Sequence, residues 1–190
     1  MKRILLAAAL AALAGVAGAE MTSFRIGAAV GSAHFDADCA DATSCDKSGT
    51  SYKVYGDYRL NDRWSVEGGY MKFNQFKASP YTLFDATGDA KIKVTAPYLA
   101  LATRANIIDD LNGVVRMGLA RVRTEGSVDV SGTVNEQAQI KVKPYIGLGL
   151  EYSIMPNLQA VLGADFTQAE VSDNITMTVR LLSLGVQYGF

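Results

Sequence analysis

The chain has 190 residues and a formal net charge of −1 at pH 7, from 18 basic and 19 acidic side chains. This balance, without any basic run, excludes nucleic acid as an expected partner. After the amino-terminal segment, no apolar run reaches the ~18 residues of a membrane-spanning helix. A membrane β-barrel escapes such a search because each of its strands carries only a weak hydropathy signal.

The first 19 residues have the features of a secretory signal peptide. A short basic start precedes an apolar stretch over residues 4–16 and a small-residue cleavage site at residues 17–19. A transmembrane anchor is the alternative, but the apolar stretch is shorter than the about 20 residues that a helical span needs. We therefore expect export, cleavage before Glu20, and one mature domain over residues 20–190.

Eight segments of alternating polarity follow, separated by breaks rich in Asn, Asp, Gly and Pro. The predicted strands cover residues 23–34, 51–60, 63–73, 91–105, 112–124, 139–154, 158–167 and 176–190. Three connections are short: 60–63, 106–111 and 155–157. Four are longer: 35–50, 74–90, 125–138 and 168–175. This alternation, with an even number of strands, is typical of a barrel with short periplasmic turns and longer external loops.

The first long connection contains the chain's two cysteines, Cys39 and Cys45. In an exported chain, two cysteines this close in sequence are expected to form a disulfide. Binding of a divalent cation is the alternative, because acidic side chains lie around the pair: Asp36, Asp38, Asp41 and Asp46. Their spacing does not match a calcium-binding loop, so we assign no metal site and no cofactor.

His34, the chain's single histidine, ends the first predicted strand, with Asp36 close by. A histidine beside an acidic residue and a serine is the arrangement that a lipid-modifying or proteolytic enzyme needs. No nucleophile at a defined spacing accompanies His34. We therefore assign no catalytic residue and expect a structural or exposed side chain.

The second and third long connections are candidates for contacts outside the membrane. Phe76, Tyr81 and Phe84 lie in the second, and an exposed apolar cluster can mark a partner site. The alternative is that Phe73, together with Phe76, forms an upper aromatic girdle against lipopolysaccharide. The third connection, residues 125–138, is predicted as an extended hairpin tip that could offer an edge for strand addition.

The two faces of the predicted strands decide between a membrane barrel and a soluble one. One face is apolar, whereas the other carries charges: Arg25, Lys53, Asp57, Glu67, Arg116, Lys143, Glu151 and Asp165. Opposite charges fall at matching heights on neighbouring strands, as with Arg116 and Glu151, or Lys143 and Asp165. This favours an ion-pair network inside the barrel. A soluble, lipocalin-like barrel with its charges outside is the alternative fold.

Two further features fit a membrane barrel. Aromatic residues cluster beside the short turns, as in a periplasmic aromatic girdle: Tyr58, Trp64, Tyr152, Tyr188 and Phe190. The last ten residues alternate in polarity and end on an aromatic residue. Within them, one set of positions resembles the assembly signal of Gram-negative outer-membrane proteins: Ser183, Gly185, Tyr188 and Phe190.

Residues 59–70 and 144–158 carry the clearest family resemblance, because both are similar to the strand-turn-strand units of small outer-membrane barrels. Over its whole mature length the chain resembles the OmpA transmembrane-domain/OmpX/NspA group. The resemblance implies an all-β fold, an eight-stranded antiparallel up-and-down transmembrane β-barrel in the outer membrane of a Gram-negative cell.

We expect a role that is structural and not enzymatic, with adhesion or envelope integrity served by the external loops. The expected partners are outer-membrane lipid and lipopolysaccharide, the barrel-assembly machinery during insertion, and a host or surface partner. A small-solute pore is the first alternative, although side chains fill the lumen of an eight-stranded barrel. A lipid-modifying barrel enzyme that uses His34 is the second.

Overall fold

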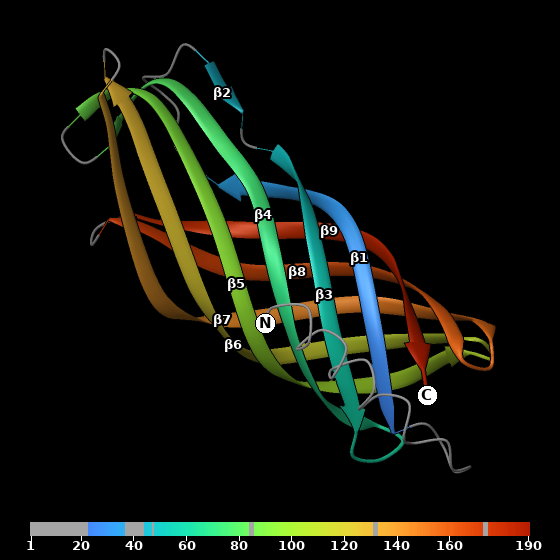
Figure 1. Ribbon diagram of the computed structural model, residues 1–190. Coiled ribbons are helices and arrows are strands. Elements are labelled where there is room, and N and C mark those ends of the chain that lie inside the picture. The colour runs from blue at the N-terminus through green and yellow to red at the C-terminus, as the bar shows by residue number, and fades with distance from the viewer. Residues whose placement is uncertain (1–22, 37–43, 47, 84–85, 131–132, 173–174) are drawn as a thin grey trace, which may run out of the picture.

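A computed structural model describes residues 23–36, 44–46, 48–83, 86–130, 133–172 and 175–190, with side chains over 23–36, 48–73, 92–127, 138–170 and 176–190. Every regular element of this part of the chain is a β-strand (Figure 1). The strands are β1 (Phe24–Asp36), β2 (Ser44–Asp46), β3 (Ser48–Arg59), β4 (Trp64–Leu83), β5 (Ala86–Ile108), β6 (Leu111–Val130), β7 (Thr133–Met155), β8 (Leu158–Ser172) and β9 (Ile175–Gly189). No helix among the described residues is long and apolar enough to cross a membrane.

The eight long strands close into a barrel. Neighbouring strands follow the order β4-β3-β1-β9-β8-β7-β6-β5, and a further pairing of β4 with β5 completes the ring. All of these pairings are antiparallel. The short strand β2 pairs only with residues 77–79 of β4. The predicted eight-stranded antiparallel barrel is therefore confirmed, with β2 as an addition to its wall.

Two hairpins are longer than the sequence predicts. Residues 74–90 were expected to form a loop, but β4 continues to Leu83 and pairs with β5 from Ala86. The ladder passes through the polar, proline-containing stretch with two register shifts, because bulges absorb residues that do not fit the pairing. The β6–β7 ladder extends to the pair Val130–Thr133, as the alternation of residues 125–138 predicts. Both hairpins reach the top of Figure 1.

We call the end of the barrel with the connections at residues 60–63, 109–110 and 156–157 the short-turn end, and the opposite end the hairpin end. From the short-turn end upward, outward side chains form an apolar belt. On successive strands the belt ends at Val30, Tyr52, Tyr70, Pro97, Leu119, Ile140, Phe166 and Leu182. Leu99 and Leu182 are 63% and 62% exposed, whereas charged side chains are buried inside. This arrangement contradicts the soluble, lipocalin-like alternative, which requires the charges outside.

The lumen has two zones. The zone nearer the short-turn end contains the buried charges. The zone nearer the hairpin end is apolar and is filled by Ala33, Phe35, Met71, Phe73, Ile92, Val94, Val122, Met177 and Val179. Phe73 does not belong to an outer girdle, because it shares the inward face of β4 with Glu67 and Met71. Its ring lies edge-on to Phe35, with 6.4 Å between ring centroids.

Candidate functional site

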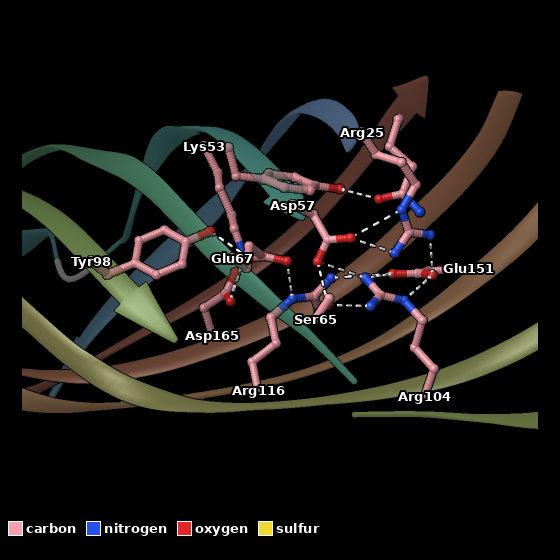
Figure 2. Close-up of polar contacts among 12 residues, drawn as sticks. Arg25, Lys53, Asp57, Ser65, Glu67, Tyr98, Arg104, Arg116, Glu151 and Asp165 are labelled. Atoms are coloured by element: carbon pink, nitrogen blue, oxygen red, sulfur yellow. Dashed lines mark hydrogen bonds and ion pairs between the residues drawn. The ribbon is translucent and has the colours of Figure 1, made fainter. Parts of the chain in front are cut away.

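Seven of the eight long strands contribute to a buried ion-pair network in the lumen (Figure 2). Its basic members are Arg25, Lys53, Arg104 and Arg116, and its acidic members are Asp57, Glu67, Glu151 and Asp165. All occupy inward positions of their strands, since successive side chains of a strand point to opposite faces. Four positive and four negative groups face each other there, so the network is balanced in charge.

Asp57 on β3 joins the first and fifth strands of the chain. Arg25 donates hydrogen bonds to Asp57 Oδ1 from Nε at 3.0 Å and from Nη2 at 2.5 Å. Ser65 donates to Asp57 Oδ2 at 2.5 Å, and Arg104 Nη2 donates to the same oxygen at 3.2 Å. Both oxygens of this fully buried carboxylate therefore have charged or hydroxyl donors.

Glu151 on β7 connects three arginines. Arg104 approaches it in fork geometry, with Nε 2.9 Å from Oε2 and Nη2 3.2 Å from Oε1. Arg25 and Arg116 lie further away, at 3.4 Å and 3.5 Å. Paired N–H donors on one carboxylate fix its orientation as well as its charge.

Glu67 on β4 is the centre of the next layer. Arg116 Nε donates to its Oε2 at 2.6 Å, and the Tyr98 hydroxyl donates to its Oε1 at 2.6 Å. The Lys53 ammonium lies 3.4 Å from the same Oε1. Glu67 thus connects the charged zone to the tyrosines that lie above it.

Lys53 occupies an aromatic enclosure below the apolar zone. Its Nζ donates to Asp165 Oδ1 at 2.8 Å and to the Tyr145 hydroxyl at 3.1 Å, and that hydroxyl donates to Asp165 in turn. The Tyr55, Tyr98 and Tyr145 ring centroids lie 5.2, 5.1 and 5.7 Å from Nζ, within cation–π distance. Asp165 Oδ2 has no hydrogen-bond partner among the described residues.

The structure brings seven of the eight predicted network residues together, and Lys143 is the exception. Lys143 Nζ lies 2.5 Å from Glu170, closer to the hairpin end. The β7–β8 ladder sets Asp165 opposite Gly147 and not opposite Lys143. Asp165 instead pairs with Lys53, whose strand lies across the lumen. In so narrow a barrel, side chains reach across the lumen as readily as along the wall.

Arg104 and the tyrosines belong to the network but were not predicted. Arg104 could have been found, because Leu99 and Leu101 face outward and the alternation of β5 then points Arg104 inward. The tyrosines depend on cross-strand partners: Gly27 lies opposite Tyr55, and Gly69 lies opposite Tyr98. A Cβ at Gly27 would overlap the Tyr55 ring, so the missing side chain makes room for the aromatic one.

The predicted girdle residues lie at the short-turn end on the outside of the wall. Tyr58, Trp64, Tyr152, Tyr188 and Phe190 are all exposed there. Phe190 stacks on Phe24 with 6.5 Å between ring centroids. The residues of the predicted assembly signal lie on both faces of β9, with Ser183 buried in the lumen and Tyr188 outside. This last strand pairs with β1 and β8, so it closes the barrel.

His34 faces outward near the hairpin end of β1. Its Nδ1 lies 3.2 Å from Ser48 Oγ on the neighbouring strand β3. Asp36 does not orient this histidine, because its carboxylate accepts a hydrogen bond from Arg180 at 3.2 Å. The predictions for Cys39 and Cys45, and for Phe76, Tyr81 and Phe84, concern side chains outside the described residues.

A closed barrel with an apolar outer belt and a charged lumen defines a transmembrane β-barrel. The profile of the OmpA-like transmembrane domain family matches residues 19–190, and the chain belongs to this family of outer-membrane barrels. No curated protein sequence matches the chain significantly.

Solved structures agree on the fold. Neisserial surface protein A superposes with a TM-score of 0.63 and 18% identity, covering 88% of this chain and 97% of its own. OprG of Pseudomonas aeruginosa gives 0.56 and 17%, covering 88% and 95%. Ail, the attachment invasion locus protein of Yersinia pestis, gives 0.53 and 20%, covering 87% and 98%. At these identities the likeness shows the fold alone.

Proposed function

We propose that this protein is a structural outer-membrane barrel whose long hairpins interact with a host surface or with neighbouring envelope components. The observation that carries the proposal is the length of these hairpins beyond the apolar belt. The belt ends at Tyr70 on β4 and at Leu119 on β6, but the strands continue to Leu83 and Val130. At about 3.4 Å per residue, β4 thus continues for about 40 Å along the strand.

A paired hairpin suits surface recognition better than an irregular loop of the same length. Its backbone is already ordered by cross-strand hydrogen bonds, so little conformational entropy is lost on binding. β2 pairs with β4 over residues 77–79 and widens this platform. Attachment by Ail, which its name states, makes surface contact a reasonable role for another barrel of this architecture.

The lumen supports a structural role and argues against a small-solute pore. Buried ion pairs fill the charged zone, and Phe35, Phe73 and their neighbours fill the apolar zone. An ion that crossed the barrel would have to displace both layers.

The test is attachment of whole cells that produce the protein. Replacement of residues 74–90 by a Gly/Ser linker should reduce attachment to cultured host cells and to matrix-coated surfaces. The matched control replaces residues 171–175, the tip of the short β8–β9 hairpin, and should attach normally. Heat-dependent gel mobility would verify that each variant folds. Unchanged attachment after replacement of both long hairpins, residues 74–90 and 125–138, would remove the surface-interaction role. Detergent sensitivity of a deletion strain would then test envelope integrity alone.

Catalysis by His34 is the second candidate, and the His34–Ser48 hydrogen bond is the observation in its favour. A Ser-His pair also needs a group that orients the histidine, but the nearby Asp36 is engaged by Arg180. We therefore propose a non-enzymatic barrel. His34→Ala should leave the lipid composition of producing cells unchanged by mass spectrometry, and loss of a lipid product in that variant would establish the enzyme instead.

We also propose that the mature protein begins at Glu20, reaches the outer membrane through the barrel-assembly machinery, and contains a Cys39–Cys45 disulfide. Intact-mass measurement of protein purified from the outer membrane tests two of these points. Cleavage removes the first 19 residues, and reduction of the disulfide adds two hydrogens. A retained leader or an unchanged mass on reduction would contradict them separately.

A further inference from the structure

The outer wall of the barrel carries an asymmetric band of charge directly beyond the apolar belt. On β4 and β6, outward basic side chains follow the last apolar positions directly: Lys72, Arg121 and Arg123. On β5 the neutral Thr95 comes first, and Lys93 is the next outward position. On β1, β3 and β8 the outward positions that follow the belt are neutral: Ser32, Thr50 and Gln168. The β9 position is a single basic residue, Arg180, whose Nη2 lies 3.2 Å from Asp36.

The strand register places the basic side chains next to one another. Lys72 lies opposite Thr95, and Thr95 lies opposite Arg123, so these three form one row across three strands. Arg121 lies two residues nearer the belt on the same face of β6, where Leu119 ends the apolar run. In the following row, Lys93 lies opposite Glu125.

A shallow hollow of about 460 Å³ lies within this patch. Its lining combines two basic groups and one acidic group with hydroxyl and apolar ones: Tyr70, Thr95, Pro97, Arg121, Arg123, Glu125 and Ile140. Tyr70 lies opposite Pro97 at the edge of the belt, and Ile140 lies opposite Arg123. The hollow therefore offers apolar surface to a hydrocarbon chain directly beside basic groups that can bind an anionic headgroup.

The positive charge of the patch is largely uncompensated within the described side chains. Arg123 Nε lies 2.9 Å from Glu125, and both side chains are about half exposed, so solvent weakens this pair. Arg121, Lys72 and Lys93 form no ion pair with a described side chain. Charged groups at a membrane boundary without local partners are available to an anion that the membrane itself presents.

We propose that this hollow binds the phosphorylated sugar headgroup of an outer-leaflet glycolipid, the lipid A part of lipopolysaccharide, with an acyl chain along the belt. The guanidinium groups of Arg121 and Arg123 suit phosphate because they present paired N–H donors. Lys72 and Lys93 add positive charge on the β4 and β5 side of these arginines, while Tyr70 and Ile140 pack against the hydrocarbon. This site is separate from the long hairpin tips, so it stands or falls independently of the surface-interaction role.

The experiment uses the full mature protein in nanodiscs of zwitterionic phosphatidylcholine, titrated with purified bisphosphorylated lipid A. Native mass spectrometry counts the bound lipid. Arg121→Gln combined with Arg123→Gln should weaken binding about ten-fold or more, because each guanidinium loses charge-assisted hydrogen bonds. Arg121→Lys combined with Arg123→Lys retains the charge and should fall in between.

The matched control is Arg180→Gln, which removes an equally exposed arginine on β9 outside the hollow and should leave affinity unchanged. Dephosphorylated lipid A should bind the unaltered protein as weakly as bisphosphorylated lipid A binds the double Gln variant. Equal affinity of the two lipids, or equal losses in the control and the double Gln variant, would overturn the site. Full displacement of the lipid by equimolar inorganic pyrophosphate or by soluble polyglutamate would also overturn it, because the occupant would then be a soluble anion or an acidic polypeptide.

Discussion

Glu67 has no exposed surface, and Arg116 and Lys53 both depend on its carboxylate for charge balance. Glu67→Gln would keep the shape of the side chain but leave two buried cations short of an anion. Removal of one partner of a buried pair costs about 3–5 kcal/mol, so the free energy of unfolding should fall by that order. Urea unfolding in lipid vesicles, followed by fluorescence of the single Trp64, measures it.

Glu125→Gln is the matched control for this change, since Glu125 also pairs with an arginine but on the exposed wall. Its effect on the free energy of unfolding should stay within about 0.5 kcal/mol. Equal losses of unfolding free energy in the two variants would contradict the view that the lumen pair contributes more to stability because it is buried.

Gly31 illustrates a close approach between two backbones. An added Cβ at Gly31 would overlap the carbonyl oxygen of Leu182 on β9, and a backbone group cannot rotate away as a side chain can. Gly31→Ala should therefore destabilise the barrel by about 1–3 kcal/mol, the usual cost of overpacking. At Gly68 the nearest atom to an added Cβ is a Leu99 methyl group at 3.7 Å. Gly68→Ala should unfold at the same urea concentration as the unaltered protein, and a comparable loss there would point to strand propensity instead.

The sequence predicts the direction of a side chain much better than its partner. Period-two alternation is enough to point Arg25, Asp57 and Glu151 inward and Leu99 outward, because it is a property of one strand. The partner of Asp165 is different, since it depends on which strand lies across the lumen and on how far a lysine reaches. The sequence of one strand contains neither fact, so pairing along the wall was expected where pairing across the lumen is found.

At the scale of elements, β7 and β8 separate near the hairpin end. Their ladder stops at the pair Ile146–Phe166, although β7 begins at Thr133 and β8 ends at Ser172. Three side-chain contacts span the gap: Thr167 donates to the Pro144 carbonyl oxygen at 3.0 Å, and Glu170 pairs with Lys143 at 2.5 Å and Lys141 at 3.3 Å. Among the described residues, side chains hold this seam, because the backbone ladder between β7 and β8 does not reach it.

Glu170 is the residue on which this seam depends most. The hydrogen bond from Lys143 lowers the pKa of the Glu170 carboxyl, which lies beyond the apolar belt. Because the pKa is lowered, the carboxylate stabilises the seam fully at pH values above the ordinary glutamate pKa of about 4.3. This stabilisation is lost as the pH falls through the lowered pKa. Glu170→Gln should therefore speed amide hydrogen exchange over residues 138–145 at neutral pH.

Asp36→Asn is the control for the seam, because its partner Arg180 lies on β9, where the β1–β9 ladder is continuous to the pair Asp36–Thr178. Exchange near β1 should not change, since backbone pairing persists without the ion pair. Below the lowered pKa of Glu170, the unaltered protein should exchange as fast as Glu170→Gln. A seam that is equally protected in Glu170→Gln would show that Thr167 and packing hold it alone.

The sequence predicted the long strands but not the full lengths of β4 and β5. Residues 74–90 contain Pro80 and glycine, and they do not alternate cleanly, so a loop was expected there. The ladder continues because β5 offers a partner for β4, and register shifts take up the residues that do not fit. Pairing is a property of two segments, whereas polarity patterns describe one. The β6–β7 hairpin was predictable because its two arms alternate on their own.

At the scale of the whole molecule, two zones of different chemistry fill the lumen, one above the other. Ion pairs fill the charged zone, and aromatic and aliphatic side chains fill the apolar zone above it. A dry layer excludes ions because their desolvation is costly, and a balanced charged layer leaves no net field to draw one sign through. We therefore expect each zone alone to keep the barrel closed to ions.

If either zone alone excludes ions, mutations should change the conductance of a planar bilayer in a defined pattern. Phe35→Ala combined with Phe73→Ala removes two packed rings but leaves the network intact, so current should stay at the level of the bare membrane. Arg116→Ala opens space in the charged zone alone and should also stay closed. Only the variant with all three changes should show current, because both layers then admit water. Heat-dependent gel mobility must confirm that it is folded. Steady current in a single-zone variant would show that the zone left intact does not seal the barrel by itself.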